Sequence, residues 1–586
     1  MLFRFFKLSF YFRKYNQYIP LGVENIINIW YNLTQYGGIR RDKDNTRHME
    51  VKLMKNGILK KLLSVALVFV LCFLVMAPAS AAAANGKCDC DEIPIIYVRG
   101  RAKVYLDKND LDGPAFGEVD DEVVMEKLKG ILPIWAKALV TDDFSEFNDY
   151  LVEAFEELFG GYGLDENGEI TDNSGISWTW SEDSLKDVHK GLNCDTPDTS
   201  NEYIYRYFYQ YDCRLSPCEV ADGLHEYIEA VKRVTGHDKV NILARCLGTN
   251  IASAYFAEYG WDDINTVVLY NPITNGTAIN DSLFTGRIVL DADSVDFFVN
   301  QQLDDEDSPI LSFIKALITL LNKTYGLDML LGMANTTIDE DIAKDVIPRI
   351  MKFSYGVMPG YWSMVSPEYY EQAKAFIFED DADEYAGMIK KLDEWNYNVA
   401  VNLEDMYKQM EADGVQVDIV TKYGYQLYPV VENSNQQSDT IVTVKQQSFG
   451  AKSAPIGKTL TEDYIAKAKA KGTDKYISPD KIIDASRGLF PDTTWYIKDI
   501  THNNYPKVID QFLLHLFRDG GRMNIWSEEE YPQYLVYEGE DENINDRIYA
   551  MEDGNTGTEL VEPSLTEAVV NFFVSFFKLM VSIFNK

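Results

Sequence analysis

One cysteine in this chain lies in a pattern of small residues that suits nucleophilic chemistry. Cys246 is the centre of A-R-C-L-G, between an apolar run at 240–244 and a helix-forming run at 249–259. A sharp turn from a strand into a helix crowds the positions two before and two after its central residue, so both must be small. Ala244 and Gly248 satisfy that requirement. The pattern predicts a nucleophile elbow in which Cys246 attacks an acyl carbon through its thiolate.

Acyl transfer also requires hydrogen-bond donors for the negative charge that develops on the carbonyl oxygen. The backbone N–H of Leu247, at the N-terminus of the predicted helix, is one expected donor. The second donor is expected in the turn after the first predicted strand, at Gly100 and Arg101. These residues form the predicted oxyanion hole.

His502 is the candidate general base. It follows a predicted strand at 493–497, in the loop I-T-H-N-N-Y-P. His515 belongs instead to a helical run at 509–517, where a packed or surface side chain is the simpler interpretation. Three other histidines precede Cys246 and so have the wrong chain order for this arrangement: His189, His225 and His237. The alternative for His502 is a loop histidine without a catalytic role.

Asp439 is the candidate acid that orients the base. It lies in S-D-T-I-V, in the polar loop after a predicted strand at 415–423. There it would accept the Nδ1–H of His502 and fix the tautomer of the ring. Asp418 falls inside the strand pattern and Glu432 comes earlier in the loop, so both rank lower. The alternative for Asp439 is an Asx turn.

Strand-like and helix-like segments alternate around these residues, which predicts a mainly parallel α/β sheet. The first part of the chain runs through an apolar strand, an aromatic strand, a helix, a strand, a helix and a strand, at 93–98, 203–211, 220–235, 240–244, 249–259 and 266–270. Strand patterns return at 415–423 and 493–497. Between 273 and 414 the pattern is helical, which we interpret as a lid inserted into the sheet. A separate helical domain is the alternative.

Three further motifs resemble those of one enzyme family. Y-D-C-R-L-S-P at 211–217 resembles the Y-D-W-R-L-x-P motif of lecithin–cholesterol acyltransferase-like enzymes, with Cys213 in place of tryptophan. Y-G, a proline and then S-D-T-I-V, within 423–442, resemble the acid loop of that family. M-P-G-Y-W at 358–362 resembles its cap segment. The resemblance extends over 93–515 and implies an α/β-hydrolase fold with a lid, acting on acyl esters of lipids.

The chain departs from the family at three positions. Cys246 replaces the nucleophilic serine, Ala244 the elbow glycine and Ser438 the acid-loop glycine. A thiolate leaves a tetrahedral adduct more readily than an alkoxide does, so a cysteine elbow favours thioesters and activated esters over triglycerides. We therefore expect a lipase-like hydrolase or acyltransferase that works through an acyl-enzyme on a triad of Cys246, His502 and Asp439.

The residues leave two alternatives open. One is a catalytically silent protein of the same fold that binds lipid or a cell-surface partner, although such a protein has no need of His502 and Asp439 in this order. The other is a structural Cys246, joined by a disulfide to Cys213 or Cys218.

The N-terminal region predicts export. Residues 54–84 combine a basic start, an apolar centre at 62–76 and the small-residue cleavage site A-S-A, as a signal peptide does. We interpret 1–53 as a mistaken upstream extension of the reading frame. The expected location is secreted or cell-surface associated.

Composition limits the partners. The chain has 586 residues, 46% of them hydrophobic, so it is too long for one ordinary core and too apolar to be mainly disordered. A formal charge of −37 argues against nucleic-acid binding, which needs clustered Lys and Arg. The polar stretches that begin at Asp107 and Asp165 lack the ligand spacing of calcium loops. We therefore expect no metal and no cofactor.

The expected organisation is a core in two halves, 85–272 and 415–537, with the lid at 273–414 between them. An acidic linker at 538–563 leads to an amphipathic helix at 564–586. This helix opens with the capping-box sequence S-L-T-E and has a thin polar stripe on a wide apolar surface. We expect it to contact a membrane surface. The alternative is that it packs back on the body of the protein.

Overall fold

The computed structural model describes most of the chain after residue 92. The described residues are 93–117, 143–190, 203–302, 309–337, 343–379, 381–517, 522–539, 546–552 and 564–571, with single positions between 127 and 141 and at 573. The predicted upstream extension, the predicted signal peptide and the cysteines Cys88, Cys90 and Cys194 lie outside them.

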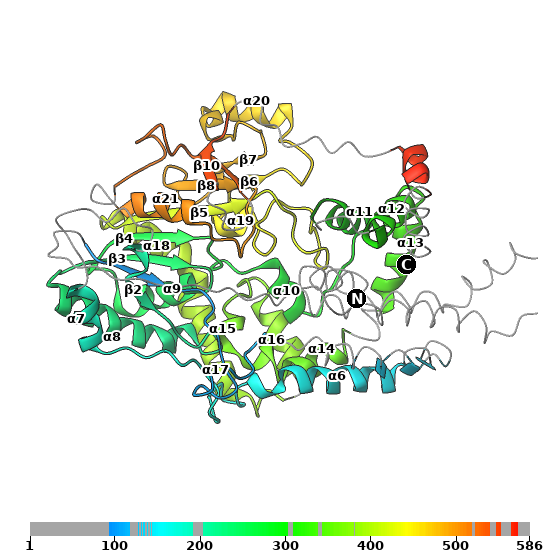
Figure 1. Ribbon diagram of the computed structural model, residues 1–586, viewed down its shortest axis with the longest axis horizontal. Helices are drawn as coiled ribbons and strands as arrows, with labels where there is room; N and C mark the ends of the chain where they lie inside the picture. Colours follow the sequence, from blue (N-terminus) through cyan, green and yellow to red (C-terminus); the bar gives the residue numbers. More distant parts are fainter. Residues whose placement is uncertain are drawn as a thin grey trace, which may run out of the picture.

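A mostly parallel sheet forms the centre of the protein (Figure 1). Within the described residues it has eight strands in the order β10-β9-β8-β5-β4-β3-β1-β2. Every neighbouring pair is parallel except β9 and β10. The strands are β1 (Ile95–Val98), β2 (Tyr207–Tyr209), β3 (Val240–Arg245), β4 (Ile264–Tyr270), β5 (Gln416–Tyr423), β8 (Thr494–Lys498), β9 (Tyr534–Glu538) and β10 (Arg547–Ala550). The predicted mainly parallel α/β sheet is confirmed.

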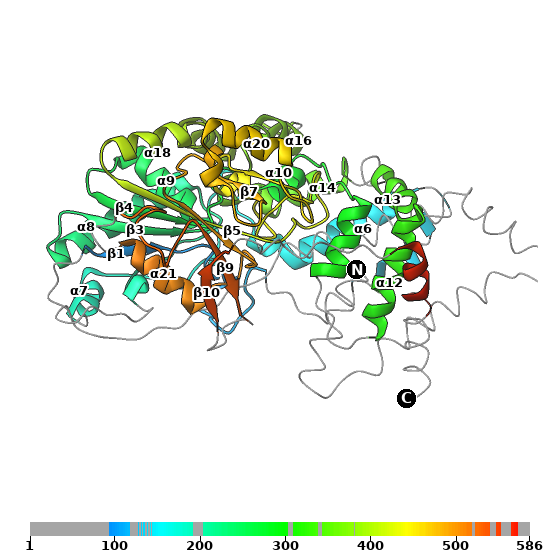
Figure 2. The ribbon, with the colours of Figure 1, turned by 90° about the horizontal axis from the view of Figure 1, so that it is seen from above.

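Helices cover both faces of the sheet, which explains why the central strands are almost continuously apolar. Side chains alternate along each strand, so Ile242 enters the core on one face and Leu243 the core on the other. The first face is covered by α8 (Pro217–Thr235) and α9 (Gly248–Tyr259), and the second by α21 (Lys507–Phe517) (Figure 2). The carboxyl ends of the parallel strands therefore meet at one edge, where loops can assemble a site.

The described residues between β4 and β5 are helical and contain no strand. The helices are α10 (Ala278–Phe284), α11 (Ala292–Phe297), α12 (Pro309–Lys323), α13 (Gly326–Thr337), α14 (Val346–Met351), α15 (Pro359–Trp362), α16 (Tyr370–Phe378), α17 (Ala386–Glu394) and α18 (Leu403–Ala412). α11, α12 and α13 project to one side of the sheet, whereas α15, α16 and α17 lie below it in the view of Figure 1. The helical pattern predicted for 273–414 is present.

Other elements form the remaining connections. They are α6 (Ser145–Phe159) and α7 (Glu182–Lys190) before β2, then α19 (Val444–Gln447), β6 (Lys452–Ser453), α20 (Glu462–Lys471) and β7 (Ile483–Asp484) before β8. The strand predicted at 203–211 is shorter in the structure, because Tyr203–Tyr205 form a 3-10 turn before β2. This turn places the Tyr205 ring against Tyr97 of β1.

The C-terminal region differs in one respect from the expectation. Residues 547–550, inside the predicted linker, are the edge strand β10. The predicted capping box is present: the Ser564 hydroxyl accepts the N–H of Glu567 at 3.3 Å, and the Glu567 carboxylate accepts the N–H of Ser564 at 2.8 Å. The helix that follows lies beside α13 (Figures 1 and 2). None of the described helices has the length and apolar character needed to cross a membrane.

Candidate active site

Cys246 occupies a sharp turn between β3 and α9. Its φ is 51°, in the left-handed region that residues with a Cβ seldom adopt. Its N–H donates to the carbonyl oxygen of Tyr270 on β4 at 3.2 Å. A Cβ atom at Gly248 would lie 2.3 Å from the carbonyl oxygen of Val98, so this position requires glycine. The local geometry is that of the predicted elbow.

The structure brings Cys246, His502 and Asp439 together. The Nε2 atom of His502 is 3.1 Å from the Sγ atom of Cys246, and its Nδ1 atom is 2.7 Å from Oδ2 of Asp439. His502 is 2% exposed and Asp439 is fully buried, so water competes little for these contacts. The three predicted side chains form one hydrogen-bonded chain.

Asp439 orients the imidazole with one carboxylate oxygen and stabilises its own loop with the other. Its Oδ1 atom accepts the N–H groups of Ile441 at 3.1 Å and Val442 at 2.8 Å. Its backbone oxygen accepts the N–H of His502 at 2.7 Å. The Asx turn that was the alternative role for Asp439 is thus present together with the contact to the histidine.

The pKa values of Cys246 and His502 are shifted in opposite directions. Burial alone would raise the pKa of the Cys246 thiol, but the charge and hydrogen bond of His502, with the N–H of Leu247, outweigh burial and lower it. Burial also opposes the charged form of His502, yet the charges of Asp439 and Cys246 raise its pKa to about 9. The pair therefore favours a thiolate beside an imidazolium, which is the nucleophilic form of cysteine.

The other described cysteines have the opposite character. Burial raises the pKa of Cys213 and of Cys218 to about 12 in each case. Both thiols are free, as is that of Cys246. Among the described cysteines, only Cys246 has an environment that stabilises a thiolate.

The predicted oxyanion residues surround the thiol to different degrees. The N–H of Leu247 donates to the sulfur of Cys246. Gly100 lies against Cys246, since a Cβ atom there would be 3.2 Å from the Cβ and 3.8 Å from the Sγ of the cysteine. The Arg101 side chain instead contacts the hydroxyl of Tyr361 at 3.5 Å and lies over the ring of Phe116. Any contribution of Arg101 to an oxyanion hole would therefore come from its backbone.

A buried lysine that the sequence interpretation overlooked holds the histidine loop. Lys422, at the end of β5, is fully buried. Its ammonium group donates to the carbonyl oxygens of Thr501 and His502 at 3.3 Å each and to that of Asn504 at 2.6 Å. Burial lowers the pKa of Lys422, and the charge of Asp439 opposes that shift. The feature of the sequence that could have indicated this role is the lysine inside the apolar strand pattern V-D-I-V-T-K-Y.

Asn271 was also overlooked. It follows β4 with a φ of 39° and is fully buried. Its amide nitrogen lies 3.2 Å from both ring nitrogens of His502 and donates to the hydroxyl of Tyr505 at 3.3 Å. Equal distances to both nitrogens place the amide nitrogen over the face of the imidazole ring, because at the ring edge it would overlap Cε1. The feature of the sequence that could have indicated this residue is its position before a proline, at the end of a buried strand.

Two of the motifs behind the family resemblance touch each other. Arg214 is fully buried and forms a two-pronged ion pair with Asp212, with N–O distances of 2.7 and 3.0 Å. Its remaining nitrogen donates to the Tyr162 carbonyl and the Ser174 hydroxyl at 2.9 Å each. The N–H of Gly360 donates to the Arg214 carbonyl at 3.0 Å. Y-D-C-R-L-S-P therefore docks the M-P-G-Y-W segment beside the sheet.

The residues that ranked lower lie elsewhere. His515 pairs with Glu528 at 2.8 Å and packs against the ring of Tyr531. Asp418 is buried within β5, where Gln416 donates to it at 2.7 Å. Within the described part of the chain, neither forms a hydrogen bond with Cys246, His502 or Asp439.

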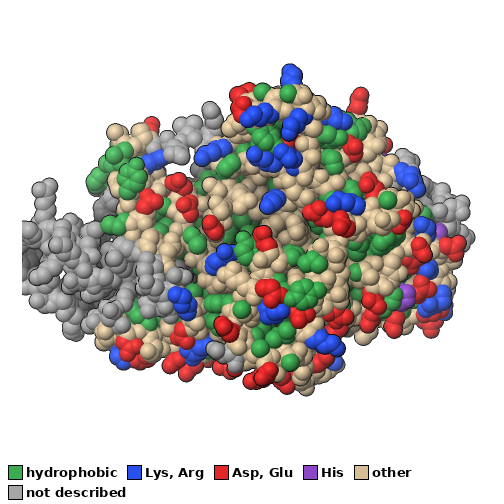
Figure 3. All heavy atoms as spheres, turned by 180° about the vertical axis from the view of Figure 1, so that it is seen from behind, with side chains coloured by type: hydrophobic (Ala, Val, Ile, Leu, Met, Phe, Trp, Pro, Cys, Tyr) green, Lys and Arg blue, Asp and Glu red, His purple; other side chains and the backbone are tan. Residues whose placement is uncertain are grey.

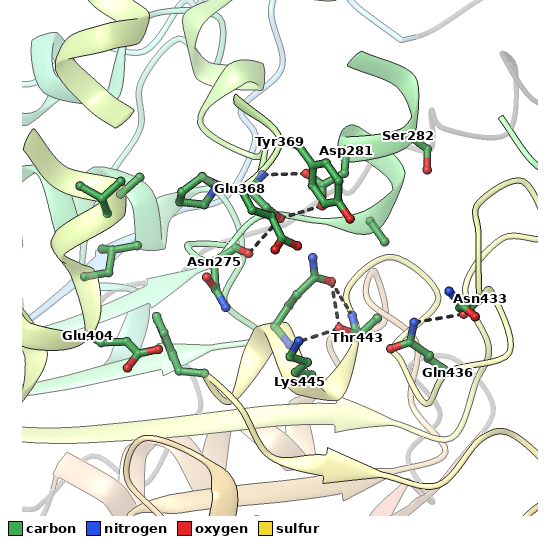
Figure 4. Close-up of a pocket in the computed structure, with 18 of the residues that line it drawn as sticks. Asn275, Asp281, Ser282, Glu368, Tyr369, Glu404, Asn433, Gln436, Thr443 and Lys445 are labelled. Carbon is green, nitrogen blue, oxygen red and sulfur yellow. Dashed lines mark hydrogen bonds between the residues drawn. The ribbon is translucent and has the colours of Figure 1, made fainter. Parts of the chain in front are cut away.

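A separate pocket of 670 Å³ opens beside the acid loop (Figure 4). Lys445 and Thr443 line it from the segment after Asp439, and Asp281 and Tyr369 line it from the helical segment. The Asp281 carboxylate accepts from the Ser366 N–H and hydroxyl at 2.7 Å each. None of Cys246, His502 and Asp439 lines this pocket, so it is distinct from the candidate site.

The surface seen from behind carries both signs of charge among apolar side chains (Figure 3). Basic side chains gather at the top of that view, which is the end of the molecule where Figure 1 places α20. Acidic side chains lie along the lower part of the same face.

Fold and site together define an α/β protein with a cysteine–histidine–aspartate arrangement at the carboxyl ends of its strands. The chain matches no family model and no curated protein.

Proposed function

We propose that the protein is an acyl-transfer enzyme of the α/β-hydrolase type, with Cys246 as nucleophile, His502 as general acid and base, and Asp439 as the residue that orients the base. The observation that carries this proposal is the chain of contacts from Sγ through the imidazole to the carboxylate, at 3.1 and 2.7 Å. It is supported by the lowered pKa of Cys246, because the thiolate is the reactive form.

The proposed reaction has two halves. The thiolate of Cys246 attacks the carbonyl carbon, and the N–H of Leu247 hydrogen-bonds to the oxyanion that forms. The C–S or C–O bond to the leaving group breaks, and the His502 imidazolium donates its Nε2 proton to that group. His502 then takes a proton from water or an alcohol, which attacks the acyl-cysteine and regenerates the thiolate.

The proposed substrates are acyl thioesters and activated esters, including those of lipids. A thiolate leaving group competes evenly with Cys246 in the tetrahedral adduct, whereas an alkoxide needs the proton of His502 in order to leave. Lipid hydrolysis or acyl transfer therefore depends on how well His502 reaches the leaving oxygen. No role in this reaction requires a metal or cofactor.

The strand order supports the assignment to the α/β-hydrolase fold. The elbow follows a central parallel strand, and the acid and the base follow β5 and β8, in the chain order nucleophile, acid, base. We propose that the helical segment between β4 and β5 acts as the lid. The docking of Gly360 on Arg214 supports this role, because it fixes the interior of that segment beside the residues that follow β2.

A catalytically silent binding protein is the second candidate. The free thiol of Cys246 and the hydrogen-bonded base favour an enzyme over that candidate. A disulfide between Cys246 and Cys213 or Cys218 is disfavoured, since all three thiols are free. Export to a secreted or cell-surface location, with lipid as partner and no nucleic acid, completes the proposal.

The direct test is the intact mass of the protein after incubation with an acyl-thioester probe. We expect one added acyl group on the native protein, none on Cys246→Ala, and one on the control Cys218→Ala. Undiminished acylation of Cys246→Ala would refute the assignment of the nucleophile.

A further inference from the structure

Two arginine side chains lie next to each other beside the nucleophile. The strands β1 and β3 pair in parallel, with Val98 opposite Ala244. The next residues along these strands are Arg99 and Arg245, so both project from the same edge and the same face of the sheet. Each is half-buried. Arg245 directly precedes Cys246.

Neither guanidinium has a hydrogen-bond or ion-pair partner among the described residues. The Nε–H of Arg245 is inaccessible to solvent and has no acceptor. Its guanidinium carbon lies 3.4 Å from the centre of the Tyr505 ring and 5.7 Å from that of Tyr97. Leaving a buried donor without an acceptor is unfavourable. Arg214 is the contrasting case, because all of its contacts are with the carboxylate of Asp212 and with neutral oxygens.

The charges around this pair compensate it only in part. The chain has 92 acidic residues, yet none of the described ones forms an ion pair with Arg99 or Arg245. Asp510 is a carboxyl on this side of the sheet on which the charge of Arg245 acts, but the Tyr205 hydroxyl donates to it, and burial raises its pKa to about 7. Burial lowers the pKa of Arg99; the hydroxyl of Tyr97 opposes that shift, and the charge of Arg245 adds to it. The charge of Arg245 also helps to lower the pKa of the Cys246 thiol, so the thiolate offsets part of the charge of the pair. The charge that remains is positive and favours binding of an anion.

We infer that Arg99 and Arg245 bind an anionic group of the substrate, a carboxylate or a phosphate, within a side chain's length of Cys246. Paired guanidinium groups match the planar or tetrahedral oxygens of such anions and bind them in a two-pronged manner. Tyr505 holds the Arg245 guanidinium in place, and Tyr505 belongs to the same loop as His502. The anion would therefore orient the acyl bond between thiolate and base. This inference rests on the proposed function and narrows its substrate class.

The first experiment measures binding without chemistry, on Cys246→Ala, by titration calorimetry. It compares coenzyme A with pantetheine for the phosphate, and S-succinyl with S-butyryl N-acetylcysteamine for the carboxylate. We expect the charged member of one pair to bind at least about tenfold more tightly, which is ~1.4 kcal/mol. The pair that shows the difference identifies the anion. Equal affinities within both pairs, or no detectable binding of either charged ligand, would overturn the inference.

The second experiment adds Arg99→Gln and Arg99→Lys to the same background. We expect Arg99→Gln to abolish the difference and Arg99→Lys to retain part of it, because lysine keeps the charge but not the fork. The control is Arg233→Gln on α8, whose side chain is exposed and pairs with Glu182. A preference that persists in Arg99→Gln, in a protein with an unchanged melting temperature, would contradict the inference.

Turnover by the native protein separates this inference from the proposed function. Its substrates are the S-succinyl and S-butyryl thioesters, and the S-acetyl derivatives of coenzyme A and pantetheine. Equal kcat/KM values for the charged and the uncharged thioester of each pair would support the enzyme and refute the anion site. Charge-selective binding without turnover of any thioester would support the anion site and refute the proposed enzymatic activity.

Discussion

The Nε2 atom of His502 lies 3.1 Å from the Sγ atom of Cys246, although 256 residues separate the two in the chain. The contact exists because β3 and β8 belong to one parallel sheet and end at the same edge. The loop after β8 is held there by Lys422 and by the backbone of Asp439. A single hydrogen bond thus depends on strands from both halves of the chain.

Replacing Cys246 with serine should change which esters are turned over. A serine alkoxide is a poorer leaving group than a thiolate, so an adduct with an oxygen ester no longer collapses back preferentially. We expect Cys246→Ser to lose thioester turnover and to gain relative preference for an unactivated alkyl ester, measured as the ratio of the two kcat/KM values. An unchanged ratio would contradict a nucleophilic role for this position.

His502 and His515 should differ strongly in their effects. Removing a triad member costs several orders of magnitude in kcat/KM, roughly 10³–10⁴ or more. We expect such a loss for His502→Ala with a soluble thioester, and little change for His515→Ala, whose partner is Glu528. Circular dichroism melting of both variants serves as the check on folding. Comparable losses from two equally stable variants would reverse this assignment.

The reactivity of Cys246 should have a characteristic dependence on pH. The thiolate is populated above the lowered pKa of Cys246, and the imidazolium persists up to the His502 pKa of about 9. Alkylation by iodoacetamide should therefore be fast on a plateau between these pKa values and slow below the lower one. Asp439→Asn removes the main charge that stabilises the imidazolium, and the imidazolium in turn stabilises the thiolate. The acid limb of the profile, which is the rise in alkylation rate with pH, should therefore move to higher pH.

Mass spectrometry of the alkylated peptides measures this profile. Cys218 is the internal control, since its pKa of about 12 leaves it unreactive at neutral pH. An acid limb at the same pH in the native protein and in Asp439→Asn would show that the carboxylate does not act through His502.

Lys422 should act as a positioning residue for the histidine loop. Lys422→Met removes the donor to three carbonyl oxygens in a buried site, so the free energy of unfolding should fall by about 2–4 kcal/mol. His502 should also lose its fixed position, which should lower kcat by about tenfold and shift the acid limb of alkylation. Lys467→Met is the control, because Lys467 is exposed and pairs only with Asp463 among the described residues. A loss of stability with an unchanged alkylation profile would make Lys422 purely structural.

The C-terminal helix should bind lipid surfaces. In its first turns Leu565 and Val570 are 50% and 54% exposed. Deleting 565–586 should reduce co-sedimentation with anionic liposomes severalfold and leave turnover of a soluble thioester intact. Aggregation or unfolding of the truncated protein would instead assign the helix to the fold, in agreement with its place beside α13 (Figure 2).

Much of the sheet could be predicted from the sequence because buried parallel strands have a strong local signature. The runs at 240–244 and 266–270 are apolar and end at turn residues, and both are strands. The three side chains of the candidate site were also identified, since each follows a recognisable strand. Their spatial contact followed from the topology rather than from any local pattern.

The missing parts of the site depend on tertiary contacts. In the sequence, Lys422 is only a charged residue that interrupts an apolar strand. Its role in holding the histidine loop depends on the carbonyl groups after β8, which surround it in the folded protein. In the sequence, Asn271 indicates only the end of a strand, and its contact with His502 depends on the fold. The edge strand β10 lies in an acidic stretch without alternation, and only its pairing with β9 makes it a strand. Long-range pairing overrode local propensity in each case.

The long helical segment between β4 and β5 also sets the order of events during folding. β4 and β5 are neighbours at Tyr270 and Val420, so the segment must be looped out before they pair. Such non-local pairing is slow. Cys246 and its turn precede this closure, whereas Asp439 and His502 lie beyond it. The thiol therefore stays protonated and weakly reactive in the nascent chain, and it becomes a nucleophile only when the last central strands have joined the sheet.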